Sequence, residues 1–232
     1  VASFSPMTFE DIQKQHREIS VNITSSIRPL PLFAKYLRSG YLPIFTEGEN
    51  EYLPKLEQII DAVVDIDLAY IASYNAGTAV KVKRLLAVIA ESAPFKPNIS
   101  ALAAKMGLSR DRILEYIYQL KDAGLLNVLS AQGKGVSRLQ KPDKLFLENT
   151  NLSYAIHPDP NQGNLRETFL LNQLLHAGLE VSEPQTGDFL VEQVHIEVGG
   201  KNKGSQQVRN ADRYLIAADG IETGFGAKIP LW

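Results

Sequence analysis

Apolar residues recur at helical spacing in the first part of the chain. They are Leu56, Ile59, Ile60, Val63 and Val64. Steps of three and four residues place side chains on one face of a helix, so this stripe predicts an amphipathic helix. Upstream, residues 33–43 predict a shorter helix that Gly40 ends and Pro43 turns. Residues 1–75 should therefore form a small helical unit. Because the stripe has few partners within that unit, we expect it to pack against a domain outside this chain.

Polar residues and glycine interrupt the periodic pattern at residues 73–78, which marks a boundary. Apolar positions then define one helix face over 82–89, and a short second helix is expected at 100–106. Gly107 turns the chain, and Ser109 is placed to cap a third helix that runs through Ala123. The order of these segments is typical of a helix-turn-helix.

Two strand-like runs follow the third helix, at 125–129 and 145–147, with a glycine-containing loop at 130–137 between them. A helix-turn-helix followed by such a hairpin predicts a winged helix over residues 76–147.

From residue 148 onward the pattern is mixed. A helix is expected at 164–175, ended by Gly178, and a short one at 206–212. Four apolar runs read as strands, at 189–191, 194–198, 214–218 and 229–232. Residues 148–232 are thus predicted to form an α/β domain with a helix against one sheet. The whole chain is expected to be a multi-domain α+β protein.

Composition narrows the class of protein. The 232 residues are 44% hydrophobic, which is enough for true cores. There is no run of 18 apolar residues and no signal-peptide pattern near the start, so we expect a cytoplasmic protein without a membrane partner. Cysteine is absent and the four histidines are scattered, which argues against a zinc site.

Charge is distributed unevenly, although the net charge is only −2. Residues 80–147 carry 12 basic and 5 acidic side chains, whereas residues 148–232 carry 6 and 11. A locally basic segment can attract phosphate, so it favours a nucleic-acid-contacting module. The alternative is intramolecular: the basic segment docks on its acidic neighbours.

Basic residues of the predicted winged helix are the candidates for contact with nucleic acid. On the third helix they are Arg110, Arg112 and Lys121, together with the polar Gln119, and on the wing they are Lys134, Arg138, Lys141 and Lys144. Such a helix can enter the major groove while the wing reaches the backbone. Asp111, Glu115 and Asp122 lie among them and would repel phosphate. DNA contact and a protein-adaptor role therefore remain as two alternatives.

Three acids carry the candidate chemistry of the last domain. Glu167 lies in a predicted helix, while Asp188 and Glu197 lie at or in predicted strands. Two strand carboxylates and one helix carboxylate can supply the oxygen ligands that Mg²⁺ prefers, with Asp188 and Glu197 as the metal ligands. Such a metal would activate water, and Lys201 or Lys203 would stabilise charge on a phosphate.

Gly199 departs from that arrangement. A nuclease core usually has a lysine two residues after the second strand acid, because alternate side chains point the same way. Lys201 can replace it only if the Gly199-Gly200 pair bulges the strand. An inactive, binding-only core is therefore the favoured interpretation, and an active nuclease is the alternative.

Glycine-rich stretches at 199–204 and 133–135 do not form a nucleotide-binding loop. Neither has the glycine spacing or the Gly-Lys-Ser/Thr ending that cradles a triphosphate. No such loop occurs anywhere in the 232 residues, and no Gly-x-Ser-x-Gly elbow occurs either.

Taken together, these blocks resemble the C-terminal part of a prokaryotic family of AAA-type ATPases. In the first two units the matching blocks are 33–43, 65–67, 82–86, 116–126 and 141–149. In the last they are 166–174, 187–189, 197–203 and 229–232, with Arg-Glu-Thr-Phe and Glu-Val-Gly-Gly-Lys the most specific. In that family a nucleotide-binding domain precedes a helical lid, a winged helix and a restriction-endonuclease-like domain of unknown function.

The resemblance implies that residues 1–75 are the lid, that 76–147 are the winged helix and that 148–232 are the nuclease-like domain. It also implies roles for Glu167, Asp188 and Glu197, whereas the lysine position does not match. Because the phosphate-binding loop is missing, we expect a fragment that does not hydrolyse ATP by itself. ATP and Mg²⁺ would belong to a full-length parent.

We therefore expect the effector region of an AAA-type ATPase. Its partner would be DNA, a protein, or the nucleotide-binding domain of its own parent. A metal-dependent nuclease with a winged-helix DNA-positioning module is the first alternative. A stand-alone winged-helix regulator is the second, and it would leave the lid stripe and the last domain without roles.

Overall fold

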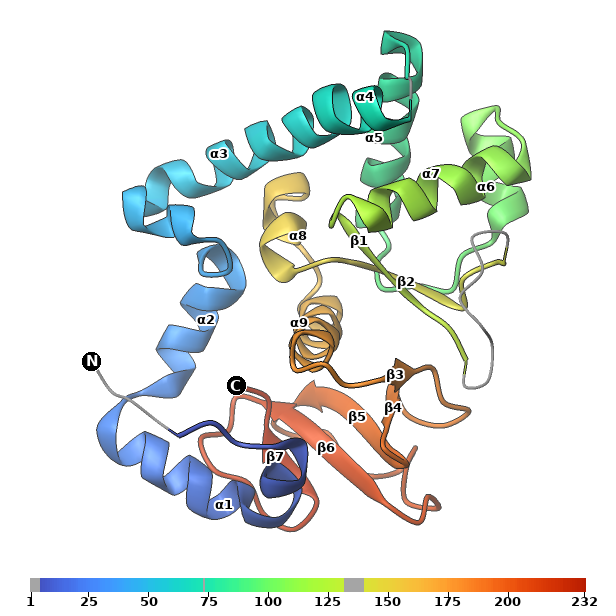
Figure 1. Cartoon of the computed structure of the whole chain (residues 1–232). Coiled ribbons are helices and arrows are strands. Elements are labelled where there is room, and N and C mark those ends of the chain that lie inside the picture. Colours follow the sequence, from blue (N-terminus) through green and yellow to red (C-terminus); the bar gives the residue numbers. More distant parts are fainter. Residues whose placement is uncertain (1–4, 73, 132–139) are drawn as a thin grey trace.

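The computed structural model describes residues 5–72, 74–131 and 140–232. Over these residues the chain is a mixed α/β structure, in which helices surround a two-stranded and a five-stranded sheet (Figure 1).

The N-terminal third is helical, as expected. Helix α1 (Phe9–Ser26) begins with a capping box, in which Thr8 and Asp11 satisfy each other's backbone N–H groups. Helix α2 (Pro29–Ser39) begins with a proline and ends at Gly40, which confirms the predicted stop. A 3₁₀ turn, η1 (Pro43–Glu47), leads to α3 (Glu49–Ala62). Helix α3 then continues through the π-helical η2 (Val63–Leu68) into α4 (Ala69–Ile71).

The middle of the chain forms the predicted helices and hairpin. The elements are α5 (Ala76–Ala90), α6 (Ile99–Met106), α7 (Arg110–Asp122), β1 (Leu126–Leu129) and β2 (Lys144–Leu147). Gly107 takes a left-handed conformation with φ of 64°, as the predicted turn requires. The Ser109 side chain accepts from the N–H of Arg112 and caps α7. Strands β1 and β2 pair antiparallel.

The C-terminal part contains two helices and the larger sheet. The helices are α8 (Thr150–Ile156) and α9 (Gln162–His176). The strands are β3 (Val181–Ser182), β4 (Phe189–Val191), β5 (Val194–Gly200), β6 (Tyr214–Asp219) and β7 (Lys228–Pro230). Strands β3, β4 and β5 form an antiparallel meander, and β6 and β7 continue the sheet in parallel.

The short helix predicted at 206–212 is not formed. That segment consists of turns, with the N–H of Val208 donating to Ser205 and the N–H of Ala211 donating to Val208. The physical reason is that Val208 is its only buried side chain, so no apolar stripe exists to bury a helix face.

Hydrophobic contacts divide the chain into two cores that do not follow the three predicted ranges. In the first core, Leu56, Ile60 and Val64 of the predicted stripe pack with residues of α5 and α7 such as Val82 and Ile117. The partner of the stripe is therefore within this chain, and the expected need for an outside domain is corrected. Ile59, the remaining stripe position on α3, is partly exposed at 38%.

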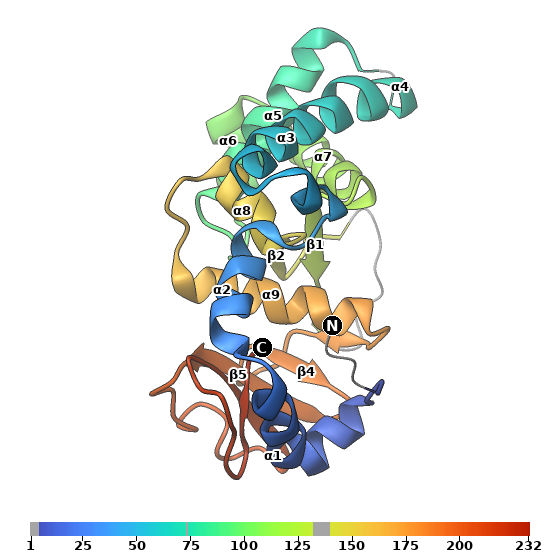
Figure 2. The ribbon, with the colours of Figure 1, turned by 90° about the vertical axis from the view of Figure 1, so that its left-hand side faces the viewer.

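The second core joins α2 to the five-stranded sheet and α9. Phe33 of α2 meets Phe169 of α9 edge to face, with ring centroids 4.7 Å apart. Helix α1 contacts β7. As Figure 2 shows, α1 and α2 run along one side of the molecule from the sheet up to α3. Residues 9–39 thus belong physically with the C-terminal sheet.

Helix α9 lies between the β1–β2 hairpin and the larger sheet (Figures 1 and 2). Phe146 of the hairpin and Phe189 of β4 are both fully buried, with ring centroids 5.9 Å apart. The hairpin therefore packs against β4 of the larger sheet. Among the described residues, no helix combines the length and the apolarity needed to cross a membrane.

Candidate functional site

The three acids predicted from the sequence come close enough together to influence one another. Glu167 lies in the second turn of α9, which Asn161 caps by accepting from the N–H groups of Gly163 and Asn164. Glu197 lies in the centre of β5 and is fully buried. Burial raises the pKa of both glutamates, and the negative charge of Asp188 raises each of them further.

Asp188 is held rigidly beside β5. Its N–H donates to the carbonyl of Ile196, and its Oδ2 accepts from the N–H of Val198, both at 2.8 Å. Gly187 makes this approach possible: a Cβ atom there would lie 3.1 Å from the Ile196 carbonyl oxygen, and its φ is +88°. The backbone of β5 thus positions the carboxylate.

Lys203 supplies the cation beside Glu197. Its Nζ forms an ion pair with Oε1 of Glu197, whose side chain is only 1% exposed. With its amide nitrogen turned toward the carboxylate, Gln207 donates to both oxygens of Glu197, at 3.0 and 3.1 Å. The turns that replace the predicted helix at 206–212 therefore cover Glu197.

Gly199 explains how Lys203 reaches this position. A Cβ atom on Gly199 would lie 2.7 Å from both Cγ and Cδ of Lys203, so the lysine passes through space that any other residue would fill. Strand β5 does not bulge here, since its register with β6 continues through Gly200. Lys201 could replace the nuclease lysine only if the strand bulged at Gly199-Gly200, so it does not take that position. Lys201 is exposed, and its carbonyl accepts from Lys228.

Lys144, predicted to contact nucleic acid from the wing, turns inward instead. Its Nζ lies 2.6 Å from Oε2 of Glu167, and its side chain is 14% exposed. The ammonium also lies 5.2 Å from the ring centroid of Phe146. The hairpin packs its inner face on the sheet, so a residue from the middle of the chain joins the acids of the last domain.

Burial dominates the electrostatics of these acids. It raises the pKa of Glu167 above its ordinary value, Asp188 raises it further, and Lys144 opposes the shift. Burial also raises the pKa of Glu197, and there Lys203 is the main opposing partner. We call Glu167, Asp188, Glu197, Lys144 and Lys203 the acid–lysine cluster.

The donor chemistry of the cluster fits a hard divalent cation, because carboxylate oxygens are what Mg²⁺ binds. Two of the three carboxylates already accept from a lysine ammonium group. A metal ion would therefore have to displace Lys144 and Lys203. Within the described parts of the chain, no three acidic, histidine or cysteine side chains are arranged to hold a metal.

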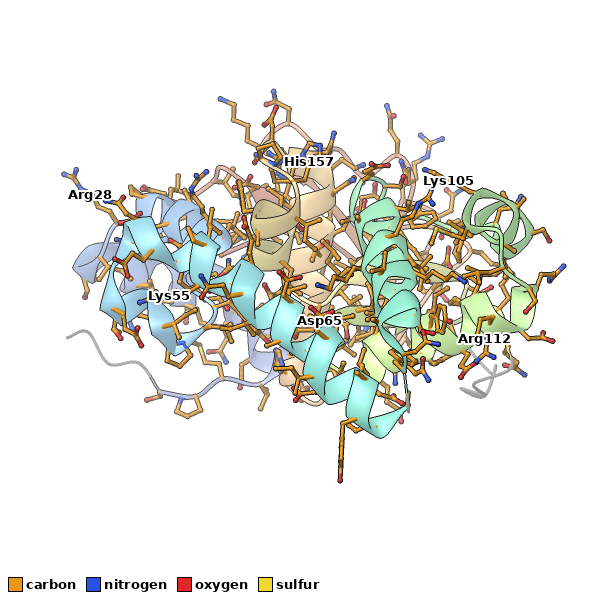
Figure 3. The ribbon with its side chains drawn as sticks, turned by 90° about the horizontal axis from the view of Figure 1, so that it is seen from above. Arg28, Lys55, Asp65, Lys105, Arg112 and His157 are labelled. Atoms are coloured by element: carbon orange, nitrogen blue, oxygen red, sulfur yellow. The ribbon has the colours of Figure 1, made fainter. Side chains whose placement is uncertain are left out.

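The other residues predicted to contact nucleic acid lie in several different surroundings. Arg110 donates to Ser100, and Arg112 pairs with Glu115 at 2.8 Å. Arg112 lies on the outside of α7 (Figure 3). Lys141 is exposed, whereas Lys134 and Arg138 lie outside the described residues. The exposed side of α7 carries basic and acidic side chains together.

Part of the basic segment docks on acidic flanks, as the intramolecular alternative expected. Lys83 pairs with Asp61 and with Asp65 of the α3–η2 helix, whose place is visible from above in Figure 3. Lys96 pairs with Glu183 at 2.5 Å, and Lys144 pairs with Glu167.

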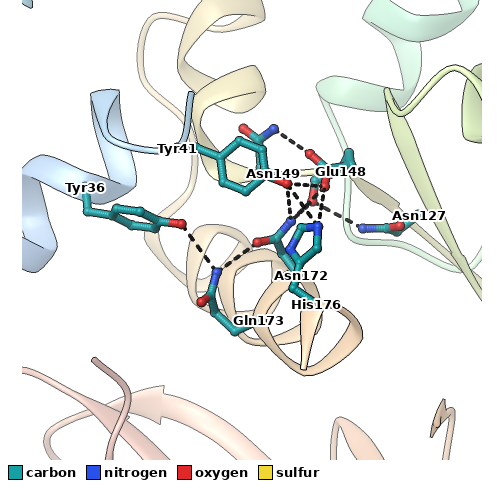
Figure 4. Close-up of polar contacts among 8 residues, drawn as sticks. All are labelled: Tyr36, Tyr41, Asn127, Glu148, Asn149, Asn172, Gln173 and His176. Atoms are coloured by element: carbon teal, nitrogen blue, oxygen red, sulfur yellow. Dashed lines mark hydrogen bonds and ion pairs between the residues drawn. The ribbon is translucent and has the colours of Figure 1, made fainter. Parts of the chain in front are cut away.

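A second polar cluster, which the sequence did not reveal, is centred on Glu148 (Figure 4). Its carboxylate accepts from the Tyr41 hydroxyl at 2.7 Å, from Asn172 at 2.8 Å and from Asn149 at 2.6 Å. Burial raises the pKa of Tyr41 to about 12, so its hydroxyl stays protonated and can donate. His176 lies against Tyr41, 3.2 Å from the hydroxyl.

Asn151 connects the residues around Glu148 to α2. Its Oδ1 accepts from the N–H of Tyr41 and from the Tyr52 hydroxyl, and its Nδ2 donates to the carbonyls of Tyr36 and Leu37. It is completely buried. Together the Glu148 and Asn151 contacts, here called the amide junction, tie α2, α3, α8 and α9 to one another.

Comparison of the chain with models of protein families, with curated proteins and with solved structures found no match.

The structure brings Glu167, Asp188 and Glu197 together, adds Lys144 and Lys203, and leaves Lys201 at the surface. Lys203 carried a sequence signal, since it follows the strand acid at short range. Lys144 carried none, because its partner lies 23 residues away in another unit.

Proposed function

We propose that this chain is the C-terminal region of an AAA-type ATPase and that it engages nucleic acid without cutting it. The sequence resemblance supports the class of parent protein. An antiparallel meander followed by two parallel strands, with Glu197 on the central strand and Asp188 directly before β4, supports a nuclease-like core for residues 148–232. Helix, short helix, glycine turn, helix and hairpin support a winged helix for residues 76–147.

The observation that carries the proposal is the pairing within the acid–lysine cluster. Glu197 is held by Lys203, and Glu167 is held by Lys144. Carboxylates held in this way present little free negative charge to a phosphate. The site can therefore lie beside a nucleic-acid backbone, which three unpaired carboxylates would repel.

The proposal is tested by binding of fluorescently labelled DNA to the whole chain, measured by anisotropy over a range of salt concentrations. We expect affinity to fall steeply with salt, because phosphate contacts release counterions. The pair of substitutions Lys134→Ala and Arg138→Ala should reduce the salt slope. The matched control is Lys35→Ala with Lys81→Ala, which removes two exposed charges elsewhere. Absence of binding at low salt would contradict the proposal and favour a protein partner.

A metal-dependent nuclease is the second candidate, and one observation favours it: Lys203 reaches Glu197 by passing over Gly199, where a nuclease has its lysine. Glu167, Asp188 and Glu197 would hold the metal once Lys144 and Lys203 had been displaced, and the metal would supply an activated water. Cleavage of plasmid DNA in Mg²⁺ or Mn²⁺ that Glu197→Gln and Lys203→Met both abolish would establish this activity. Equal cleavage by wild type and both variants would assign it to a contaminant.

A further inference from the structure

We infer that an open hollow beside the acid–lysine cluster binds a phosphate group, and that its natural occupant is one backbone phosphate of a nucleic acid. The identity of the occupant rests on the proposed function, whereas the site itself rests on geometry. The hollow has a volume of about 420 Å³ and lies where β5 ends at Gly200 and β6 ends at Asp219. In sheets with parallel strands, ligands bind outside the carboxyl ends of the strands.

The charged lining of the hollow is mainly positive. Arg166, Lys201 and Lys203 contribute cations, and Asp219 contributes the opposing carboxylate. Lys228 lies close by, since its Nζ donates to the carbonyl of Lys201 at 3.1 Å. This concentration of positive charge contrasts with the exposed side of α7, where acids and bases alternate. It favours an anionic occupant.

Arg166 is oriented for such an occupant. Its Nε donates to Oδ2 of Asp219 at 2.8 Å, which fixes the plane of the guanidinium. The two terminal nitrogens lie over Gly200, each within 4 Å of where a Cβ atom would be. A planar fork held by a carboxylate is well suited to bind two phosphate oxygens at once.

Two glycines keep the hollow open. A side chain on Gly200 would extend directly over the Arg166 guanidinium, because its Cβ atom would stand 3.8 Å from Cζ. Gly220 has φ of +78°, a conformation that other residues rarely adopt, and a Cβ atom there would approach Lys201. Glycine at both positions therefore leaves room for a ligand between the cations.

Lys203 connects the hollow to the acids. It lines the hollow and also pairs with Glu197. A phosphate in the hollow would compete with Glu197 for the ammonium group. The subsite would therefore hold the nucleic-acid backbone directly against the acid–lysine cluster.

The experiment titrates inorganic phosphate into the whole chain by isothermal calorimetry at low salt. Lys201→Glu should weaken phosphate binding by about tenfold, because one cation is replaced by an anion. Gly200→Val should abolish binding without any change in charge, since its side chain would cover the Arg166 guanidinium. Asp219→Asn should tighten binding, because it removes the competing carboxylate. Lys81→Glu and Asp159→Asn, at exposed positions elsewhere, are the matched controls.

Thermal unfolding of each variant shows whether it remains folded, and Lys201→Glu changes only an exposed side chain. Wild-type phosphate affinity in Lys201→Glu and Gly200→Val would overturn the inference, as would the absence of saturable binding. Salt-sensitive DNA binding that is unchanged in both variants would agree with the proposed function but contradict the phosphate subsite. Phosphate binding without DNA binding would support the subsite and reject nucleic acid as its source.

Discussion

Glu148, which is partly buried, and Glu197, which is fully buried, are two carboxylates that the chain satisfies in different ways. Three neutral donors bind Glu148, namely a tyrosine hydroxyl and the amides of Asn149 and Asn172, while Nε2 of His176 lies 3.9 Å from its Oε1. Glu197 is instead held by the ammonium group of Lys203, with other charges nearby. One carboxylate is solvated by dipoles, and the other is part of a group of charges.

The two kinds of contact suit different roles, one structural and one in ligand binding. Neutral hydrogen bonds satisfy a partly buried carboxylate without introducing a second charge, and at the amide junction they also tie four helices together. A buried ion pair contributes little net stability, because desolvation offsets attraction. We therefore interpret the amide junction as the device that fixes the arrangement of the two cores. The acid–lysine cluster is the device available for a ligand.

The largest predicted effect concerns the amide junction. Glu148→Ala leaves the Tyr41, Asn149 and Asn172 donors without their acceptor, so we expect the free energy of unfolding to fall by about 3 kcal/mol. Urea denaturation measures this value. Glu180→Ala, at an exposed position, is the control and should lie within about 0.5 kcal/mol of wild type. Equal values for the two variants would show that the junction is not structural.

Removal of one partner of the Glu197–Lys203 pair should have the next largest effect. Lys203→Met strands a buried carboxylate, and we expect a loss of about 2–3 kcal/mol in the same assay. Adding Glu197→Gln to that variant should recover much of the loss, because the unpaired charge disappears. Purely additive losses would mean that the two side chains do not interact in solution.

Gly199 and Gly200 provide a closely matched pair of substitutions. Gly199→Ala inserts a methyl group against Lys203 and should cost about 1–2 kcal/mol, since the lysine must leave its path. Gly200→Ala meets Arg166 only at ordinary contact distance and should be neutral or slightly stabilising. Equal effects of the two would show that Lys203 does not pass over Gly199.

The smallest effect is a pH dependence due to Glu167. Its pKa in the folded protein is raised above 4.5, so the unfolded chain loses this proton first as pH rises. The contribution of Glu167 to stability therefore falls as pH increases from about 4.5 through the folded pKa, and is constant above it. Glu167→Gln lacks this loss, so its stability relative to wild type should rise over that window. Denaturation at a series of pH values measures the difference, with Glu57→Gln as the control. A constant difference would contradict burial of the ionised carboxylate.

Much of the fold was predictable because local signals agreed with the tertiary structure. Ser109, Gly107 and Gly40 end or begin helices where their chemistry requires it. The apolar runs of β4 and β5 became strands for the same reason. The bounds of α1 were not predicted within the helical unit, because its sequence is largely polar and its few apolar side chains meet the sheet only after the chain has folded back.

The candidate site was predictable only in part. Strand alternation and the position of Glu167 in a helix were enough to group three acids. They could not indicate that Lys144 would come from the hairpin, because that depends on Phe146 packing against Phe189. Nor could they choose between Lys201 and Lys203. That choice depends on the space above Gly199 and on the turn in which the N–H of Lys203 donates to the Gly200 carbonyl.

The packing of α2 against α9 has a consequence for the order in which the protein is made. Phe33 leaves the ribosome 136 residues before Phe169, which at about 5–20 residues per second is a wait on the order of 10 s. During that time the apolar face of α2, with Phe33 and Leu37, has none of its C-terminal partners. The nascent chain would therefore expose this face to chaperones until α9 and the sheet emerge, even though the helices of the first core can already begin to pack.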